Sequence, residues 1–84
     1  MSKLIFPTIS VVMPVLNESY RLTGCLQSIR NQNYPQNKVE IIIADGGSID
    51  DSMKIAKKFS AKIYPNPLKT SEAGKAVGVK KAKG

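Results

Sequence analysis

Short apolar runs alternate with stretches of helical periodicity along the chain. The runs 8–15 (TISVVMPV), 39–44 (VEIIIA) and 61–65 (AKIYP) have the length of strands. The first two consist almost wholly of apolar residues, a pattern typical of strands covered on both faces. Pro14 and Pro65 are expected to end their strands, because proline cannot donate a hydrogen bond to a sheet.

Between these runs the apolar positions recur at helical spacing. A first amphipathic helix should begin near Asn17 or Ser19, either of which could cap it, and end at the turn-rich segment 31–37. Its inward residues fall at i, i+3, i+4 and i+7 and are Leu22, Cys25, Leu26 and Ile29.

Two further helices are expected. Ser48-x-x-Asp51 matches a capping box, so a second helix should open there, with Asp50 and Asp51 complementing its dipole. Its inward side would be Ile55, Ala56 and Phe59. A third helix, 70–83, would turn Ala73, Ala76, Val77 and Val79 inward. Gly74 and Gly78 should weaken it by about 1 kcal/mol each relative to alanine.

The resulting order, β-α-β-α-β-α, predicts an α/β fold. Strands joined by helical crossovers form a parallel sheet, here three-stranded with order 3-2-1 between two helical layers, as in half of a Rossmann-like fold. Residues 1–84 should form a single domain. In such sheets ligands bind beyond the carboxyl ends of the strands.

Composition narrows the chemistry. No apolar run approaches the roughly 20 residues of a membrane span, and the N-terminus lacks a secretory signal, so we expect a cytoplasmic protein. Cys25 is the single cysteine and there is no histidine. Acid–base chemistry would therefore fall to Asp, Glu, Lys or Tyr.

The net charge of +7 is concentrated near the C-terminus, where residues 54–84 carry nine lysines against Glu72 alone. One interpretation is an anionic partner, as in a small basic nucleic-acid-binding module. The other is a solvated lysine-rich helix face. Nucleic-acid-binding surfaces usually contain arginine and aromatic residues as well, and this segment has no arginine. Charge alone does not decide between them.

Polar residues follow the first two strands at the same edge of the predicted sheet. Pro14, Val15, Asn17 and Glu18 follow the first strand, and Asp45, Gly46, Gly47 and Ser48 follow the second. A carboxylate there can accept a hydrogen bond from a base or ribose, and adjacent glycines let a ligand approach the backbone. The two helix N-termini should also point free N–H groups at this edge. The alternative is a tight turn and a helix cap.

Two common nucleotide motifs are absent. The sequence has no G-x-x-x-x-G-K-[ST] phosphate loop and no G-x-G-x-x-G after the first strand. A nucleotide bound here would need another phosphate anchor.

Four segments in register resemble the start of a family 2 glycosyltransferase with the GT-A fold: SVVMPVLNE (10–18), SIRNQNYP (28–35), VEIIIADGGSIDDS (39–52) and GKAVGVKKAKG (74–84). The resemblance extends over almost the whole chain. It implies that the chain is the donor-binding front of an enzyme that transfers a sugar from a nucleotide-diphospho-sugar, such as a UDP-sugar, to an unknown acceptor.

The resemblance also implies roles for individual residues. Pro14, Val15, Asn17 and Glu18 would line the nucleotide pocket, together with Gly46, Gly47 and Ser48. Asp45 would bind the base, and Lys75 would lie near the diphosphate. Many relatives have a second aspartate where this chain has Gly46.

The family's Mg²⁺ or Mn²⁺ is held by an Asp-x-Asp motif that this sequence lacks, and the family's catalytic base follows later still. We therefore assign no catalytic or metal-binding residue and expect no turnover from these residues alone. The parent enzyme could be membrane-associated. The first strand, 8–13, would be an exposed apolar edge, which predicts a homodimer paired through it.

Overall fold

The computed structural model describes residues 6–82, in which strands and α-helices alternate. The elements are β1 (Ile9–Val15), α1 (Ser19–Arg30), β2 (Val39–Asp45), α2 (Ser52–Lys58), β3 (Lys62–Pro65) and α3 (Ser71–Lys81). A short 3-10 helix, Gln36–Lys38, leads into β2. The predicted element order is confirmed.

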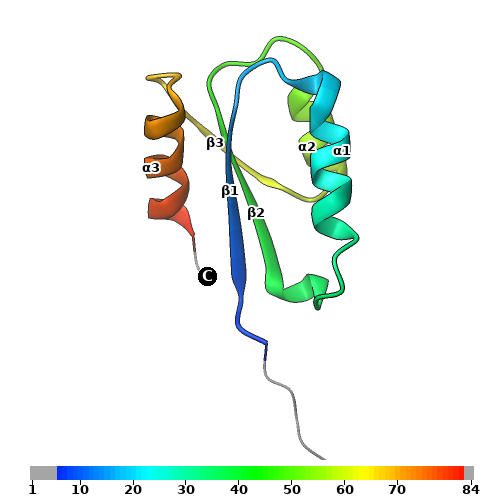
Figure 1. Ribbon diagram of the computed structural model, residues 1–84. Coiled ribbons are helices and arrows are strands. Elements are labelled where there is room, and N and C mark those ends of the chain that lie inside the picture. Colours follow the sequence, from blue (N-terminus) through cyan, green and yellow to red (C-terminus); the bar gives the residue numbers. More distant parts are fainter. Residues whose placement is uncertain (1–5, 83–84) are drawn as a thin grey trace, which may run out of the picture.

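The three strands form one parallel sheet in the order β1-β2-β3. Helices α1 and α2 cover one face and α3 covers the other, which gives the predicted three layers (Figure 1). The central strand β2 is the most buried, because it has neighbours on both edges and helices on both faces. Its Ile41 and Ile43 pack with Leu22, Leu26 and Ala56 in the main core cluster.

Pro14 does not end the first strand, as the sequence suggested. It pairs with Ala44, and Val15 continues the strand opposite Asp45. The carbonyl of Val15 accepts the N–H of Gly46, so the backbone of Val15 faces β2. Backbone groups alternate along a strand, so the nitrogen of Pro14 faces the open edge, where a missing N–H breaks no ladder bond.

The inward face of α3 also differs from the prediction. Gly74 and Gly78 are buried, whereas Ala76 is exposed and Val79 is 69% exposed. A Cβ on Gly78 would lie 2.0 Å from Cγ1 of Val12, and one on Gly74 would lie 2.6 Å from Cβ of Pro14. The two glycines therefore allow α3 to lie directly against β1, and their helix-weakening effect is secondary.

Two details of the other helices also depart from the prediction. Cys25 is exposed, because its side of α1 faces the open edge of β1 and no described element covers it. Helix α2 begins at Ser52, so the segment that follows Ser48 is loop. Within residues 6–82, no helix is long and apolar enough to cross a membrane.

Candidate functional site

The carboxyl ends of the three strands meet at one edge of the sheet, which we call the rim. It consists of the loops 16–18, 46–51 and 66–70, which follow β1, β2 and β3. Each loop contains a residue in the left-handed region: Asn17 with φ 51°, Gly47 with φ 101° and Lys69 with φ 61°. Non-glycine residues in that region cost free energy and gather at functional sites, and of the three described, Asn17 and Lys69 lie at the rim and Ser60 does not.

Side chains fasten the first rim loop to the second. The N–H of Asn17 donates to Oγ of Ser48 at 3.0 Å, and Oδ1 of Asn17 accepts the N–H of Ile49 at 2.8 Å. Asparagine tolerates the left-handed backbone that this reciprocal pair requires. The role predicted for Asn17 as cap of α1 is therefore wrong, since its side chain bonds to the other loop.

The start of α1 is capped from the second loop. Oδ2 of Asp50 accepts the N–H of Ser19 at 3.1 Å, and Oγ of Ser52 accepts the N–H of Glu18 at 3.1 Å. The other carboxylate oxygen of Asp50 accepts the N–H of Ser52 at 2.9 Å. The predicted cap by Ser19 is thus wrong. The N–H groups of Glu18 and Ser19, which were expected to be free at this end of α1, are occupied by side chains of the second loop.

These hydrogen bonds act on the acidity of Asp50. The pKa of its carboxyl is lowered from 3.8 to about 2, first by the hydrogen bond with the Ser52 side chain and then by N–H groups of Ser52 and Ser19, against an opposing effect of burial. Hydrogen bonds to the charged form favour that form. Asp50 is therefore a carboxylate at all physiological pH values.

Asp45 ends β2 and closes the turn that follows it. Its Oδ1 accepts both the Oγ–H of Ser48 at 2.6 Å and the N–H of Ser48 at 3.1 Å, whereas among residues 6–82 Oδ2 accepts only the same N–H, at 3.3 Å. The predicted capping box is wrong, since Ser48 bonds back to Asp45 and not forward to Asp51. A carboxylate offers about four lone-pair positions, so Oδ2 keeps capacity for a ligand.

A hollow of about 460 Å³ lies between the second and third rim loops. One wall is Asp45, Gly46 and Gly47, and the other is formed by Ile63, Pro65, Asn66, Pro67 and Lys69. This volume is within the range of small-ligand sites. Its apolar side chains beside a carboxylate suit a planar ring that carries an N–H donor.

Two residues of this hollow were not anticipated from the sequence. Asn66 is 3% exposed, donates from Nδ2 to the carbonyl of Thr70, and has an Oδ1 without a partner among residues 6–82. Lys69 packs its Cα and Cβ against Gly46 and extends its ammonium over Gly47. Among the described residues it takes part in no ion pair. A loop of the form NPLK gave no signal for either role.

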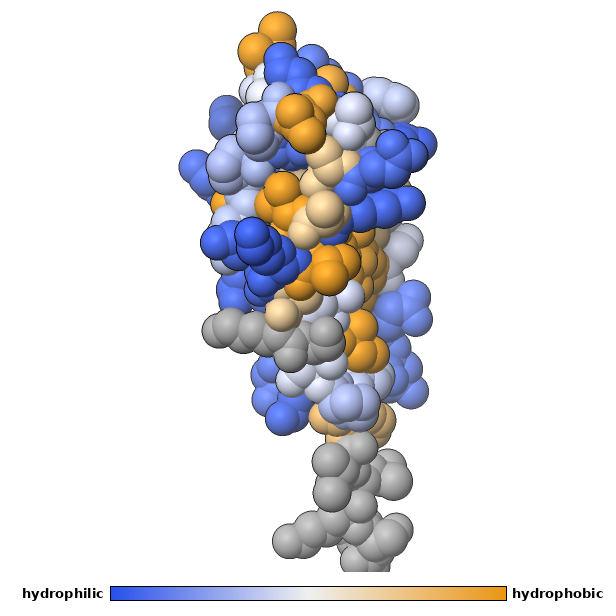
Figure 2. All heavy atoms as spheres, turned by 90° about the vertical axis from the view of Figure 1, so that its left-hand side faces the viewer, coloured by the Kyte–Doolittle hydropathy of each residue, from blue (hydrophilic) through white to orange (hydrophobic). Residues whose placement is uncertain are grey.

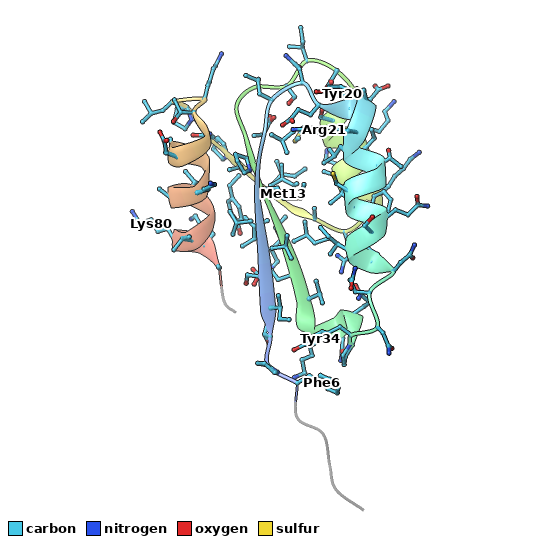
Figure 3. The ribbon with its side chains drawn as sticks, viewed as in Figure 1. Phe6, Met13, Tyr20, Arg21, Tyr34 and Lys80 are labelled. Carbon is cyan, nitrogen blue, oxygen red and sulfur yellow. The ribbon has the colours of Figure 1, made fainter. Side chains whose placement is uncertain are left out.

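The predicted site residues separate into two groups. Asp45, Gly46 and Gly47 line the hollow just described, whereas Pro14, Val15 and Glu18 line a second one of about 410 Å³ between β1 and α1. Glu18 is ion-paired there with Arg21, near the end of α1 at the rim (Figure 3). Asn17 and Ser48 join the two groups through their hydrogen bond. Lys75 is exposed on α3 and lies outside both linings.

The carboxylates of the rim do not fit a divalent metal site. Asp45 accepts hydrogen bonds from Ser48, and Asp50 accepts them from Ser19 and Ser52. Within the described part of the chain, no three acidic or cysteine side chains gather as metal ligands would. The described carboxylates therefore provide no set of ligands for a Mg²⁺ or Mn²⁺ ion.

The lysines do not form one basic surface. Lys54, Lys57 and Lys58 belong to α2, and Lys75, Lys80 and Lys81 belong to α3, on the opposite face of the sheet (Figure 1). On the face that carries α3, hydrophilic residues flank a band of hydrophobic ones (Figure 2). Two exposed apolar side chains, Leu68 and Val79, separate the charged residues. This arrangement favours solvated helix faces over a nucleic-acid groove.

Comparisons with known proteins indicate a family for the chain. The model of the family described as Glycosyl transferase family 2 matches residues 10–84. Glycosyltransferase AglE of Haloferax volcanii is 41% identical over 54 residues, which is 64% of this chain and 18% of that protein. A dolichyl N-acetyl-alpha-D-glucosaminyl phosphate 3-beta-D-2,3-diacetamido-2,3-dideoxy-beta-D-glucuronosyltransferase of Methanococcus voltae is 34% identical over 83 residues, or 90% of this chain and 26% of that protein.

Among solved structures, the chain is similar to glucosyl-3-phosphoglycerate synthase from Mycobacterium tuberculosis, in complex with Mn²⁺, uridine diphosphate and glucosyl-3-phosphoglycerate. The TM-score is 0.56 and the identity 32%, over 71% of this chain and 21% of that one. The chain thus spans about a fifth to a quarter of the length of these relatives.

Proposed function

The chain belongs to glycosyl transferase family 2, and from this premise we propose that its rim binds the nucleotide of a nucleotide-diphospho-sugar donor. The observation that carries the proposal is the hollow between residues 45–47 and 65–69, which combines a carboxylate, a bare backbone, apolar walls and a lysine that forms no ion pair with the described residues. The transfer of the sugar to an acceptor is proposed for the longer parent enzyme.

Uracil is a base that suits this hollow. Its N3–H can donate to Oδ2 of Asp45, the oxygen that accepts a single long hydrogen bond from the described residues. Cytosine presents an unprotonated nitrogen at the same ring position, which a carboxylate repels. The similar synthase was solved in complex with uridine diphosphate, which supports a UDP-sugar as the donor.

The diphosphate should be held by lysine side chains. The N–H groups of Asn17, Glu18 and Ser19, at the start of α1, already donate to side chains of the second loop, so these three are not available to an anion. Lys69 lies directly over Gly47 and is the nearer candidate, and the family resemblance adds Lys75. Fixed cations stabilise a leaving diphosphate by neutralising the charge that develops on it.

An NMR titration of the chain with UDP tests the proposal, with CDP and GDP for comparison. We expect amide shifts at residues 45–48 and 66–69, larger for UDP than for CDP. Asp45→Asn should weaken UDP binding by roughly 10- to 150-fold, because a hydrogen bond to a charged group contributes about 1.5–3 kcal/mol.

Asp51→Asn is the matched control. It removes the same charge from an exposed residue whose side chain makes no capping bond to the described residues. The proposal fails if UDP leaves the rim amides unshifted in a well-dispersed spectrum. It also fails if Asp45→Asn and Asp51→Asn bind UDP equally well.

Two further expectations concern the chain as a whole. Glycosyl transfer needs an acceptor deprotonated by a positioned base, and we assign no such base here, so we expect UDP-sugar binding without transfer.

We also propose that the open edge of β1 pairs with a second copy of the chain. The opposite edge, β3, is short and bears Lys62 and Pro65, features that discourage pairing. A monomer by light scattering at high concentration would exclude the pairing.

A further inference from the structure

One carboxylate joins the starts of two helices at the rim. Oδ1 of Asp50 accepts the N–H of Ser52 in α2, and Oδ2 accepts the N–H of Ser19 in α1, at 2.9 Å and 3.1 Å. Ser52 adds a second link, since its Oγ accepts the N–H of Glu18 at 3.1 Å. Ser52 is fully buried, so water cannot replace its hydroxyl oxygen as the acceptor.

These links determine where the neighbouring residues of the two loops lie. With the start of α1 held against the second loop, the N–H of Asn17 meets Oγ of Ser48. A hydroxyl has one hydrogen and two lone pairs. Because Ser48 accepts from Asn17, its single hydrogen remains for Oδ1 of Asp45, to which it donates at 2.6 Å. The position of α1 is thus transmitted to the carboxylate of Asp45.

We propose that Asp50 and Ser52 are positioning residues of the donor site, which hold the Asp45 carboxylate in its binding orientation through Asn17 and Ser48. The inference rests on the proposed function for its ligand. Its structural part, the dependence of Asp45 on Asp50, stands on the hydrogen bonds alone. Asp50 itself is not expected to touch the nucleotide, since it does not line the hollow beside Asp45.

The neighbouring carboxylate provides a matched control. Asp50→Ala removes both hydrogen-bond acceptors. Asp51→Ala removes an equal charge at the next position, and the side chain of Asp51 makes no capping bond in the described part of the chain. Asp50→Asn is intermediate, since its amide oxygen can still accept one of the two N–H groups. It also serves as the second variant if Asp50→Ala does not fold.

The first measurement needs no ligand. In Asp50→Ala, the N–H groups of Ser48 and Ile49 should exchange with solvent about fivefold faster than in wild type, the usual consequence of losing one helix-capping acceptor. The carboxyl carbon signal of Asp45 should shift as well. Asp51→Ala should change neither, and amides of β2 should serve as an internal reference. Unchanged exchange at Ser48 and an unshifted Asp45 in Asp50→Ala would overturn the proposal.

The second measurement is the affinity of the folded chain for UDP, which a role confined to stability would not alter. We expect Asp50→Ala to bind UDP about fivefold more weakly than Asp51→Ala, with Asp50→Asn between them. Equal affinities would overturn the positioning role. If the wild-type chain does not bind UDP at all, the proposed function fails, and the ligand-free comparison still decides whether Asp50 positions Asp45.

Discussion

Replacing Gly78 by alanine is expected to destabilise the protein, although alanine is the better helix former. A Cβ at this position would lie 2.0 Å from Cγ1 of Val12 and 3.0 Å from its Cβ and Cγ2. Apolar carbons pack at about 3.5–4.0 Å, so α3 would have to move off the sheet by roughly 1.5–2 Å or Val12 would have to leave its rotamer. Such overpacking costs about 1–3 kcal/mol.

The gain in helix propensity, about 1 kcal/mol, offsets part of this cost and leaves a net loss of up to about 2 kcal/mol. Gly24 in α1 is the matched control, because a Cβ there would meet nothing within 4 Å. Gly24→Ala should therefore stabilise the protein by about 0.5–1 kcal/mol. Urea unfolding followed by circular dichroism measures both changes.

The reasoning would be refuted if Gly78→Ala proved as stable as Gly24→Ala. A second test is to remove the atoms that clash. Val12→Ala takes away both γ-carbons, so the double variant Val12→Ala/Gly78→Ala should be more stable than the sum of the two single changes predicts. A coupling of about 1 kcal/mol or more is expected, as for residues in direct contact.

Three further predictions concern the rim. Lys69→Ala should weaken UDP binding several-fold more than Lys80→Ala does, and the difference should shrink at high salt, because Lys69 lines the hollow while Lys80 points away from the sheet (Figure 3). Asn17→Ala should cost about 1–2 kcal/mol more unfolding free energy than Asn17→Gly, since both lose the acceptor for Ile49 but only glycine adopts φ 51° readily. The pKa of Asp50 is lowered to about 2, so its carboxylate should stabilise the fold above about pH 4 and lose this effect as the pH falls towards 2. The free energy of unfolding measured between pH 4 and pH 2 should therefore fall less in Asp50→Asn than in the wild type.

The sheet and its helices could be predicted because their signals are local and redundant. Ile41 to Ala44 can be buried in only a few ways, and the spacing of Leu22 and Leu26 allows one inward face of a helix. Cys25 shares that spacing but is exposed, because its burial depends on a neighbour that the sequence pattern does not specify. Gly74 and Gly78 were interpreted by propensity alone, whereas the approach of α3 to β1 decides their role.

The edge of the sheet that carries the candidate site was predicted correctly, but the hydrogen bonds within the site were not. Asp45, Gly46 and Gly47 do line a hollow there. The capping box at Ser48 was wrong because an acid stands three residues away on either side, and Ser48 hydrogen-bonds to the preceding one, Asp45. Helix-capping patterns also assume that a helix is capped by its own chain neighbours. Here Asp50 and Ser52 cap α1 across about thirty residues of sequence, which no local pattern can reveal.

The turn at the end of β2 and the proposed binding of a base need not compete for Asp45. The turn uses Oδ1, which receives both the hydroxyl and the N–H of Ser48, and leaves Oδ2 with one hydrogen bond of 3.3 Å. A carboxylate whose first oxygen is already bound cannot rotate freely, so its second oxygen is oriented before a ligand arrives. Binding to a preorganised acceptor avoids the entropy cost of ordering it. The local turn would then be the means by which a short surface loop holds a base in one orientation, and Ser48→Ala should weaken UDP binding by removing the 2.6 Å hydrogen bond to Asp45 while leaving the charge of Asp45 in place.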